Sequence, residues 1–283
     1  MRAKTWIQYD NQGLKQGATG TPHSTQAAGD ALAAAHKNIH DQVASGALPF
    51  LNLHKDEGAW ECVGAYANAA RERFHDCVVL GIGGSSLGGR ALVTPLGGRG
   101  MRIHFPDNVD PTQLVALLNG LDLSRTLFSC ISKSGGTLET IAQLLVVRER
   151  LQQEVGEYWA RHLVITTDPE AGFLRQLADR DQLTRFEIPQ QVGGRFSVFT
   201  PVGLLPAALA GVDMARLRSG IADAVDDLTG NNAESNAALR LASDLHHLDV
   251  EQGRNVLFVT PYANGLAPLG EWFQQLWAES LGK

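Results

Sequence analysis

The sequence predicts an α/β fold, a doubly wound parallel sheet with helices on both faces. Between residues 77 and 189, short apolar runs alternate with segments of helical periodicity. Such alternation is typical of parallel strands joined by helical crossovers. Two of the apolar runs are followed directly by Gly/Ser-rich turns. These turns would lie at the carboxyl ends of the strands, where ligands of such sheets bind.

The predicted elements follow from local patterns along the chain. Residues 1 to about 20 look irregular, an Ala-rich helix follows near residues 25–45, and a further helix runs through AYANAARERF. Five strands are predicted at 77–83, 101–105, 126–132, 162–167 and 184–189, each followed by a turn or a helix.

Beyond residue 213 the pattern changes to two helical stretches, followed by the apolar run RNVLFVTPY and a last helical segment. We predict a new buried strand at 254–262. One strand cannot make a sheet, so this part would be the start of an incomplete domain. The predicted organisation is an N-terminal helical or irregular segment (1–50), a first α/β domain (51–211) and the start of a second (212–283).

The amino-acid composition restricts the classes of partner that this protein can bind. The chain is 44% apolar and 19% charged with a net charge of −6, which disfavours nucleic acid and anionic membranes as partners. The N-terminus lacks the apolar core of a signal peptide, and no apolar run is long enough to span a bilayer, so we expect a cytoplasmic protein. Cys77 and Cys130 fall in predicted strands, which indicates reduced, inert thiols.

The stretch ISKSGGTLET suggests an anion site at a strand-to-helix turn. The first N–H groups of a helix lack intrahelical acceptors and favour negative charge. Ser132, Ser134 and Thr137 would add hydroxyl donors, and Lys133 a cation. Phosphate is the obvious ligand. The alternative is an ordinary turn with a Ser or Thr helix cap that binds nothing.

The stretch GIGGSSLGG has two interpretations. Gly81 and Gly83 start a dinucleotide fingerprint, but Ser86 stands at its third glycine position, while Asp107 could serve as the ribose-binding acid. Alternatively this is a second phosphate- or hydroxyl-binding turn that presents Ser85. Two Gly/Ser turns at one edge favour a phosphorylated, polyhydroxylated ligand.

Two further segments carry charged candidates. Arg195 follows two glycines and could stabilise an oxyanion, although a surface arginine is the commoner case. Gln275 and Glu279 are four residues apart on a predicted helix rich in aromatic residues, where a desolvated carboxylate could act as a general base. An exposed helix glutamate is the alternative. The histidine pairs lack a third ligand nearby, so no metal site is predicted.

Together these segments resemble one family. VVLGIGGSSLGGRAL, the DNVDP loop, ISKSGGTLET, GGRFSVFTPVGLLP and WFQQLWAESLGK are similar, in this order, to the signatures of glucose-6-phosphate isomerases, from about residue 50 onward. The resemblance implies two sugar-isomerase domains, a homodimer, a hexose 6-phosphate substrate and no cofactor. Gly136 departs from the family, which usually has threonine there.

The resemblance also implies roles for individual residues. The base would be Glu279, with Arg195 beside the developing enediolate. The substrate would be held by Gly84, Ser85, Ser132, Lys133, Ser134, Thr137 and Gln275. The implied reaction interconverts glucose 6-phosphate and fructose 6-phosphate through a cis-enediolate.

Two alternatives remain at this point: a non-catalytic sugar-phosphate sensor of the same fold family, and a nicotinamide-dependent enzyme. The family's ring-opening histidine and late lysine follow the ESxGK signature, beyond Lys283. We therefore expect this chain alone to bind sugar phosphates weakly and to isomerise them poorly.

Overall fold

A computed structural model describes residues 9–12, 26–230 and 236–282. The chain forms two compact units. The helical unit combines Met1–Leu51 with Arg218–Val259, and the sheet unit combines Asn52–Leu217 with Thr260–Lys283. The sheet unit contains every residue predicted to form the site. Whether residues 212–283 begin a second α/β domain stays a prediction.

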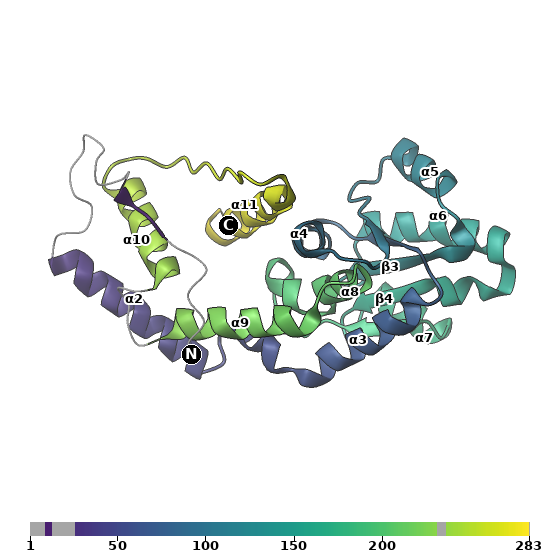
Figure 1. The fold of residues 1–283 in the computed structure, drawn as a ribbon, viewed down its shortest axis with the longest axis horizontal. Coiled ribbons are helices and arrows are strands. Elements are labelled where there is room, and N and C mark those ends of the chain that lie inside the picture. Colours follow the sequence, from purple (N-terminus) through teal and green to yellow (C-terminus); the bar gives the residue numbers. More distant parts are fainter. Residues whose placement is uncertain (1–8, 13–25, 231–235, 283) are drawn as a thin grey trace. The chain divides into compact units, whose positions relative to one another are not determined.

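The sheet has five parallel strands in the order β2-β1-β3-β4-β5. Figure 1 labels β3 and β4. Their bounds are β1 Asp76–Leu80, β2 Arg102–His104, β3 Thr126–Ser132, β4 Leu163–Thr167 and β5 Thr184–Glu187. The central strands are buried along their whole length, as strands covered on both faces are. All five predicted strands are confirmed.

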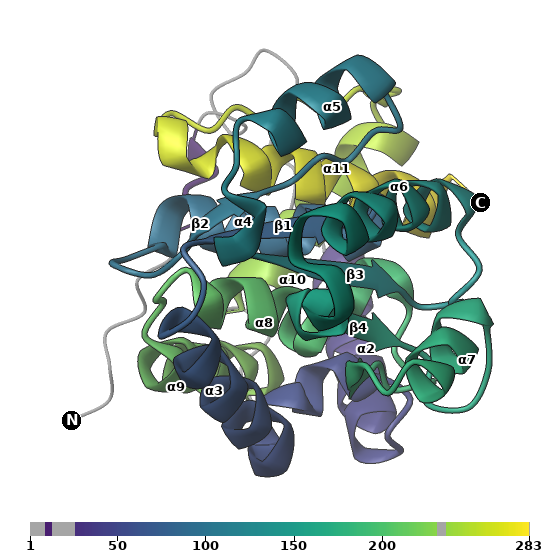
Figure 2. The same ribbon diagram turned by 90° about the vertical axis from the view of Figure 1, so that its right-hand side faces the viewer.

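Helices cover both faces of the sheet, as predicted. One face carries α5 (Pro111–Asn119), α6 (Leu138–Val155) and α7 (Phe173–Arg180), whose leucines pack on the strands. The other carries α3 (Glu57–Arg71), α4 (Leu87–Leu96) and α8 (Pro201–Leu209), with α11 (Ala267–Leu281) packed on α4. Figure 2 shows the strands as a band between α6 and the pair α3 and α8.

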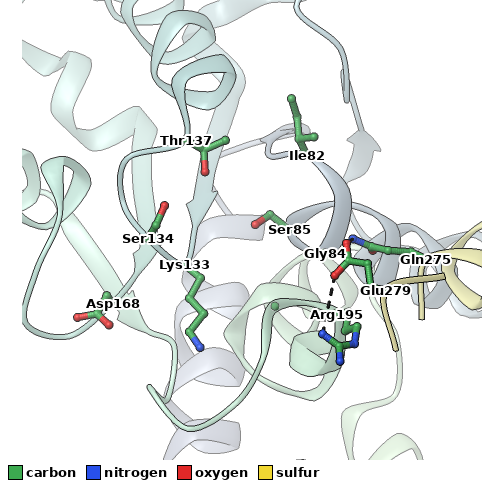
Figure 3. Close-up of a pocket in the computed structure, with 11 residues that line it drawn as sticks. Ile82, Gly84, Ser85, Lys133, Ser134, Thr137, Asp168, Arg195, Gln275 and Glu279 are labelled. Atoms are coloured by element: carbon green, nitrogen blue, oxygen red, sulfur yellow. Dashed lines mark hydrogen bonds and ion pairs between the residues drawn. The ribbon is translucent and has the colours of Figure 1, made fainter. Parts of the chain in front are cut away.

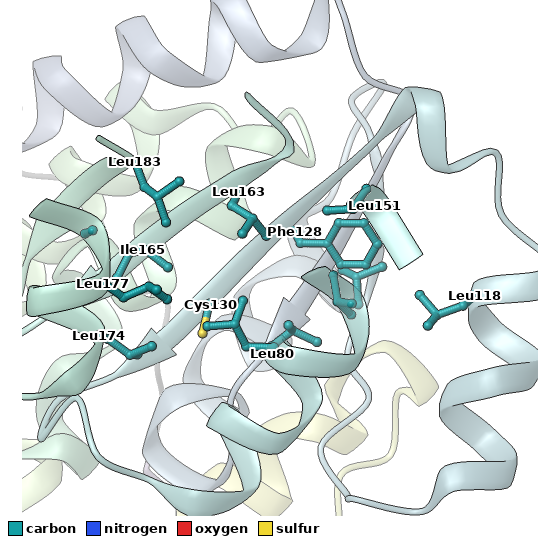
Figure 4. Packing of buried hydrophobic residues seen from close by; sticks show 14 of the residues in the cluster. Leu80, Leu118, Phe128, Cys130, Leu151, Leu163, Ile165, Leu174, Leu177 and Leu183 are labelled. Carbon is teal, nitrogen blue, oxygen red and sulfur yellow. The ribbon is translucent and has the colours of Figure 1, made fainter. Parts of the chain in front are cut away.

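The core between the sheet and α5, α6 and α7 centres on β3 and β4. Phe128 and Cys130 of β3 lie beside Leu163 and Ile165 of β4, all at most 1% exposed (Figure 4). Cys77 and Cys130 are buried free thiols, and burial raises the pKa of Cys77 to about 12. This confirms the expectation of inert thiols.

The strand order places the candidate turns. From β1 the chain first moves outward to β2 and then returns to the opposite side of β1 as β3. The point between β1 and β3 is therefore the topological switch point, where ligands of open α/β sheets bind. The Gly81–Ser86 and Ser132–Thr137 turns leave these two strands at their carboxyl ends.

The opposite, amino edge of the sheet carries a charged cluster. Asp76, the first residue of β1, has a side chain that is only 3% exposed. Arg102 Nη2 donates to it at 2.6 Å, and His104 Nε2 lies 2.8 Å from its other oxygen. Arg102 pairs with Asp76 in the β1–β2 register, so the strand pairing itself brings the two charges together.

In its described residues, the helical unit consists of α2 (Gln26–Ala44), α10 (Ala237–Val250) and the later part of α9 (Met214–Thr229). Asp244 of α10 is 2% exposed and accepts hydrogen bonds from Tyr9 and Asn11. The Nε2 atom of His36 in α2 lies 2.7 Å from the carbonyl oxygen of Gly230. Among the described helices, none is long and apolar enough to cross a membrane.

The predicted strand at 254–262 is wrong. Residues 253–261 have no regular secondary structure, and the side chains of Val256, Phe258 and Tyr262 are 71%, 85% and 98% exposed. The apolar pattern is present, but a strand also needs a neighbour to pair its backbone groups. Every strand among the described residues pairs within the one sheet, and none pairs with this segment.

Candidate active site

A cavity of about 730 Å³ lies at the carboxyl edge of the sheet, within the size range of small-molecule sites. Eight of the nine predicted site residues line it, together with three others. Figure 3 shows the Ser134 and Thr137 side chains on one side of the cavity and Gln275, Glu279 and Arg195 on the other. The lining residues are Ile82, Gly84, Ser85, Lys133, Ser134, Thr137, Asp168, Gly194, Arg195, Gln275 and Glu279.

The ninth predicted residue, Ser132, lies behind the lining of the β3–α6 turn (residues 132–137). It is 1% exposed, and its Oγ is 2.7 Å from Thr137 Oγ1. Thr137 occupies the N-cap position of α6, yet its side chain makes no capping hydrogen bond. An ordinary Thr cap would accept a hydrogen bond from the first turn. Here the Thr137 hydroxyl is instead paired with the Ser132 hydroxyl beside the cavity. This disfavours the interpretation of Thr137 as a simple helix cap.

Lys133 lines the same cavity, but its ammonium group is already engaged. Nζ donates to the carbonyl oxygens of Gln190 at 2.9 Å and Val192 at 2.7 Å. A lysine ammonium has three donors, so one remains for a ligand in this arrangement. Lys133 thereby connects the β3–α6 turn to the segment that leads into Arg195.

The β1–α4 turn (residues 81–86) is shaped by close backbone approach. A Cβ on Gly84 would lie 2.6 Å from the carbonyl oxygen of Gly194, so only glycine fits there. Gly83 has φ of +56°, and a Cβ on it would lie 3.0 Å from Gln275 Nε2. The glycines therefore let this turn touch both the Arg195 segment and α11, and Ser85 lines the cavity from the same turn.

Arg195 faces α11. Its Nε donates to Ser280 Oγ at 3.0 Å, and Nη1 is 3.9 Å from Glu279 Oε2. The guanidinium carbon also lies 4.6 Å from the centre of the Phe196 ring. The side chain is 28% exposed, so Arg195 is held beside the cavity by three neighbours, in contrast to a free surface arginine.

Gln275 and Glu279 lie on one face of α11, as their spacing predicts. Gln275 Nε2 donates to Glu279 Oε1 at 3.0 Å. The Glu279 side chain is 34% exposed and lies beside a cation and an amide. This environment differs from the sequence interpretation of a carboxylate desolvated among aromatic residues.

An ion-pair chain fixes the start of α11. Arg90 Nη1 of α4 is 3.2 Å from Glu271 Oε2 and 3.4 Å from Asp107 Oδ2. Gln143 of α6 donates to the carbonyl oxygens of Pro106 and Asn108 on either side of Asp107. Asp107 thus has a structural partner, and the ribose-binding role considered for it loses support.

The sequence matches the phosphoglucose isomerase family model over residues 54–283. The chain belongs to the phosphoglucose isomerase family. It is 46% identical over 219 residues to a glucose-6-phosphate isomerase of Rubrobacter xylanophilus, covering 74% of this chain and 50% of that protein. It is 43% identical over 239 residues to an enzyme of the same name from Thermus thermophilus, covering 83% and 56%.

Solved structures give the same relationship. A Thermus thermophilus protein described as hypothetical superimposes with a TM-score of 0.82 at 38% identity, over 90% of this chain and 61% of the other. A glucose-6-phosphate isomerase of Chlamydia trachomatis gives 0.61 at 28% identity, over 80% and 44%. The chain spans about half the length of the relatives that it matches.

Sequence reasoning missed four residues of the site. Ile82, Asp168 and Gly194 line the cavity, and Ser280 anchors Arg195. Asp168 directly follows β4, so the rule that ligands bind at the carboxyl ends of strands could have found it. Backbone N–H groups of Glu170 and Ala171 hold the pKa of Asp168 below its ordinary value.

Proposed function

We propose that this chain supplies the sugar-phosphate site and the catalytic base of an aldose–ketose isomerase that interconverts glucose 6-phosphate and fructose 6-phosphate. The proposal is supported by family membership and by one arrangement above all. A carboxylate paired with an amide and a guanidinium faces, across one cavity, a turn that presents hydroxyls at a helix start.

The proposed chemistry needs three groups. With the phosphate held at the β3–α6 turn, Glu279 takes a proton from C2 of the open aldose or from C1 of the ketose. The electron pair moves onto the carbonyl oxygen and gives a cis-1,2-enediolate. Arg195 stabilises that developing negative charge. A proton passes from the hydroxyl oxygen of the enediolate to its charged oxygen, and the same carboxyl then returns its proton to the neighbouring carbon, which leaves the carbonyl group on the other oxygen. This assignment uses side chains alone and keeps the expectation that no cofactor takes part.

Three further expectations stand with this proposal. The ligand is a hexose 6-phosphate, the complete protein is a homodimer, and its location is cytoplasmic. The β3–α6 turn would grip the phosphate, leaving the sugar carbons C1 and C2 toward α11. A cavity of about 730 Å³ is large enough for a ligand of this size.

Proton exchange tests the base directly. Fructose 6-phosphate incubated with the protein in D₂O should gain deuterium at C1, followed by NMR. Exchange on the open-chain fraction of this ketose needs no ring-opening residue, only the base, the oxyanion partner and the phosphate grip. Glu279→Gln should slow exchange at least about 10²-fold. Glu149→Gln is the matched control, since Glu149 is an exposed glutamate of α6 that does not line the cavity.

The outcomes separate clearly. Exchange by the parent and by Glu149→Gln, but not by Glu279→Gln, supports the assignment of the base. The proposal is wrong if the parent catalyses no exchange, or if Glu279→Gln exchanges at the parental rate.

A further inference from the structure

The β3–α6 turn does not hold its shape alone, because a second turn lies directly behind it. This is the β4–α7 turn (residues 167–174), which enters α7 through Gly172. Three carbonyl groups of the β3–α6 turn accept hydrogen bonds from it. Thr167 Oγ1 donates to Ser132 O at 2.8 Å, Asp168 N to Lys133 O at 3.2 Å, and Leu174 N to Gly135 O at 3.0 Å.

The two turns also interlock sterically. Gly172 has φ of +98°, and a Cβ on it would lie 2.4 Å from Ser134 O and 3.0 Å from Gly135 Cα. Gly135 has φ of +64°, and a Cβ on it would lie 3.1 Å from Gly172 Cα. Neither position tolerates a side chain without backbone movement, so two glycines of different turns fix one backbone spacing.

This arrangement has an electrostatic consequence. A carbonyl oxygen that faced the cavity would repel an anion. Here the carbonyls of residues 132, 133 and 135 are bonded to the β4–α7 turn. Ser134 and Thr137 still line the cavity, and the first N–H groups of α6 follow them. Backbone dipoles ordered in this way form anion-binding concavities.

We infer that Gly172 and Thr167 are positioning residues for the anion site, although neither lines the cavity. They hold the carbonyl groups of the β3–α6 turn away from the cavity. The hydroxyl and N–H donors of that turn are thereby kept in position to bind a phosphate group. The inference rests on the proposed function, because it assigns the phosphate grip to this turn.

Gly172→Ala tests the interlock. The added methyl group must push Ser134 O away and so misplace the donors of the β3–α6 turn. A misplacement of about 1 Å can cost about 10²-fold in the rate of a catalysed reaction. We expect the affinities for inorganic phosphate and for glucose 6-phosphate, measured by calorimetry, to fall at least about tenfold. Gly156→Ala is the matched control, because Gly156 also has positive φ (+58°) but nothing within 4 Å of the added Cβ. Gly156→Ala should lower the thermal stability, because alanine is strained at positive φ, and should leave the affinity unchanged.

A second pair of variants covers the case in which Gly172→Ala does not fold. Thr167→Val removes the hydroxyl that donates to Ser132 O while keeping the branched shape, and should weaken phosphate binding about three- to tenfold. Thr167→Ser keeps the hydroxyl and should restore the affinity.

The inference is overturned if folded Gly172→Ala binds phosphate as Gly156→Ala does, or if Thr167→Val binds as Thr167→Ser does. If the parent chain itself binds neither inorganic phosphate nor glucose 6-phosphate, the proposed function fails and the inference fails with it.

Discussion

The two edges of the sheet use polar residues in opposite ways. At the amino edge, Asp76 is buried and both of its oxygens are bonded to Arg102 and His104. At the carboxyl edge, Thr137, Arg195 and Glu279 surround a cavity. The comparison teaches that a polar cluster in this fold indicates function only where its groups face an accessible space. A cluster whose charges satisfy one another contributes to stability.

The largest difference between the two edges of the sheet should come from Thr137→Ala at the carboxyl edge. Loss of a hydrogen bond to a charged phosphate should weaken sugar-phosphate binding by roughly 1.5–3 kcal/mol. Calorimetry with fructose 6-phosphate measures it. Thr112→Ala is the control, because Thr112 lies at the start of α5, away from the cavity. Unchanged affinity with an intact circular dichroism spectrum would remove Thr137 from the site.

The amino edge should give the reverse pattern. Asp76→Asn replaces a charged acceptor of two hydrogen bonds by a neutral amide, and should lower the free energy of unfolding by about 1–2 kcal/mol. The affinity of the folded protein for sugar phosphate should not change. Urea denaturation measures the first quantity and calorimetry the second.

Asp179→Asn is the matched control for Asp76. Like Asp76, Asp179 has two basic partners, here Arg175 and Arg185, but its side chain is 47% exposed. Exposed ion pairs contribute about 0–1 kcal/mol, so this variant should be nearly neutral. Equal losses for the two variants, or an altered affinity in Asp76→Asn, would break the comparison between the edges.

The smallest effect is a pH dependence confined to the amino edge. Burial raises the pKa of Asp76, but hydrogen bonds from Arg102 and His104 outweigh it, so the pKa lies below its ordinary value. A lowered folded-state pKa contributes stability above the unfolded pKa of about 3.9 and loses it as the pH falls further. The stability gap between the parent and Asp76→Asn should therefore narrow below about pH 4. A gap that widens on acidification would contradict this sign.

Local pattern was sufficient to predict the five strands of the sheet. The run TLFSCIS is wholly buried as β3, because neighbouring strands pair with it on both sides. The run RNVLFVTPY is equally apolar but forms no strand. A hydrophobic pattern shows that a segment can be buried. Whether the segment pairs as a strand depends on other segments of the chain, so a single run does not determine it.

The site shows the same division. Residue type and position at a strand end suggested Ser134 and Thr137, and the family resemblance added Glu279; the structure brings all three to one cavity. The direction of the Lys133 ammonium toward the carbonyl groups of Gln190 and Val192 could not be predicted, because it depends on contacts across 57 and 59 residues. The interlock of Gly135 with Gly172 is likewise a tertiary contact, although each glycine alone is typical of an ordinary turn.

The late position of α11 in the chain sets an order of events during synthesis. The sheet is encoded by residues 76–187, whereas Glu279 and its partner Gln275 follow about 90 residues after β5 ends. At translation rates of ~5–20 residues per second, the synthesis of these residues takes roughly 5–18 s. During that time the β1–α4 and β3–α6 turns have been synthesised, but Glu279 has not. During that interval, the nascent protein could bind an anion at the β3–α6 turn before it holds a base. A phosphate compound that binds the folded turn would stabilise this part of the protein before catalysis becomes possible.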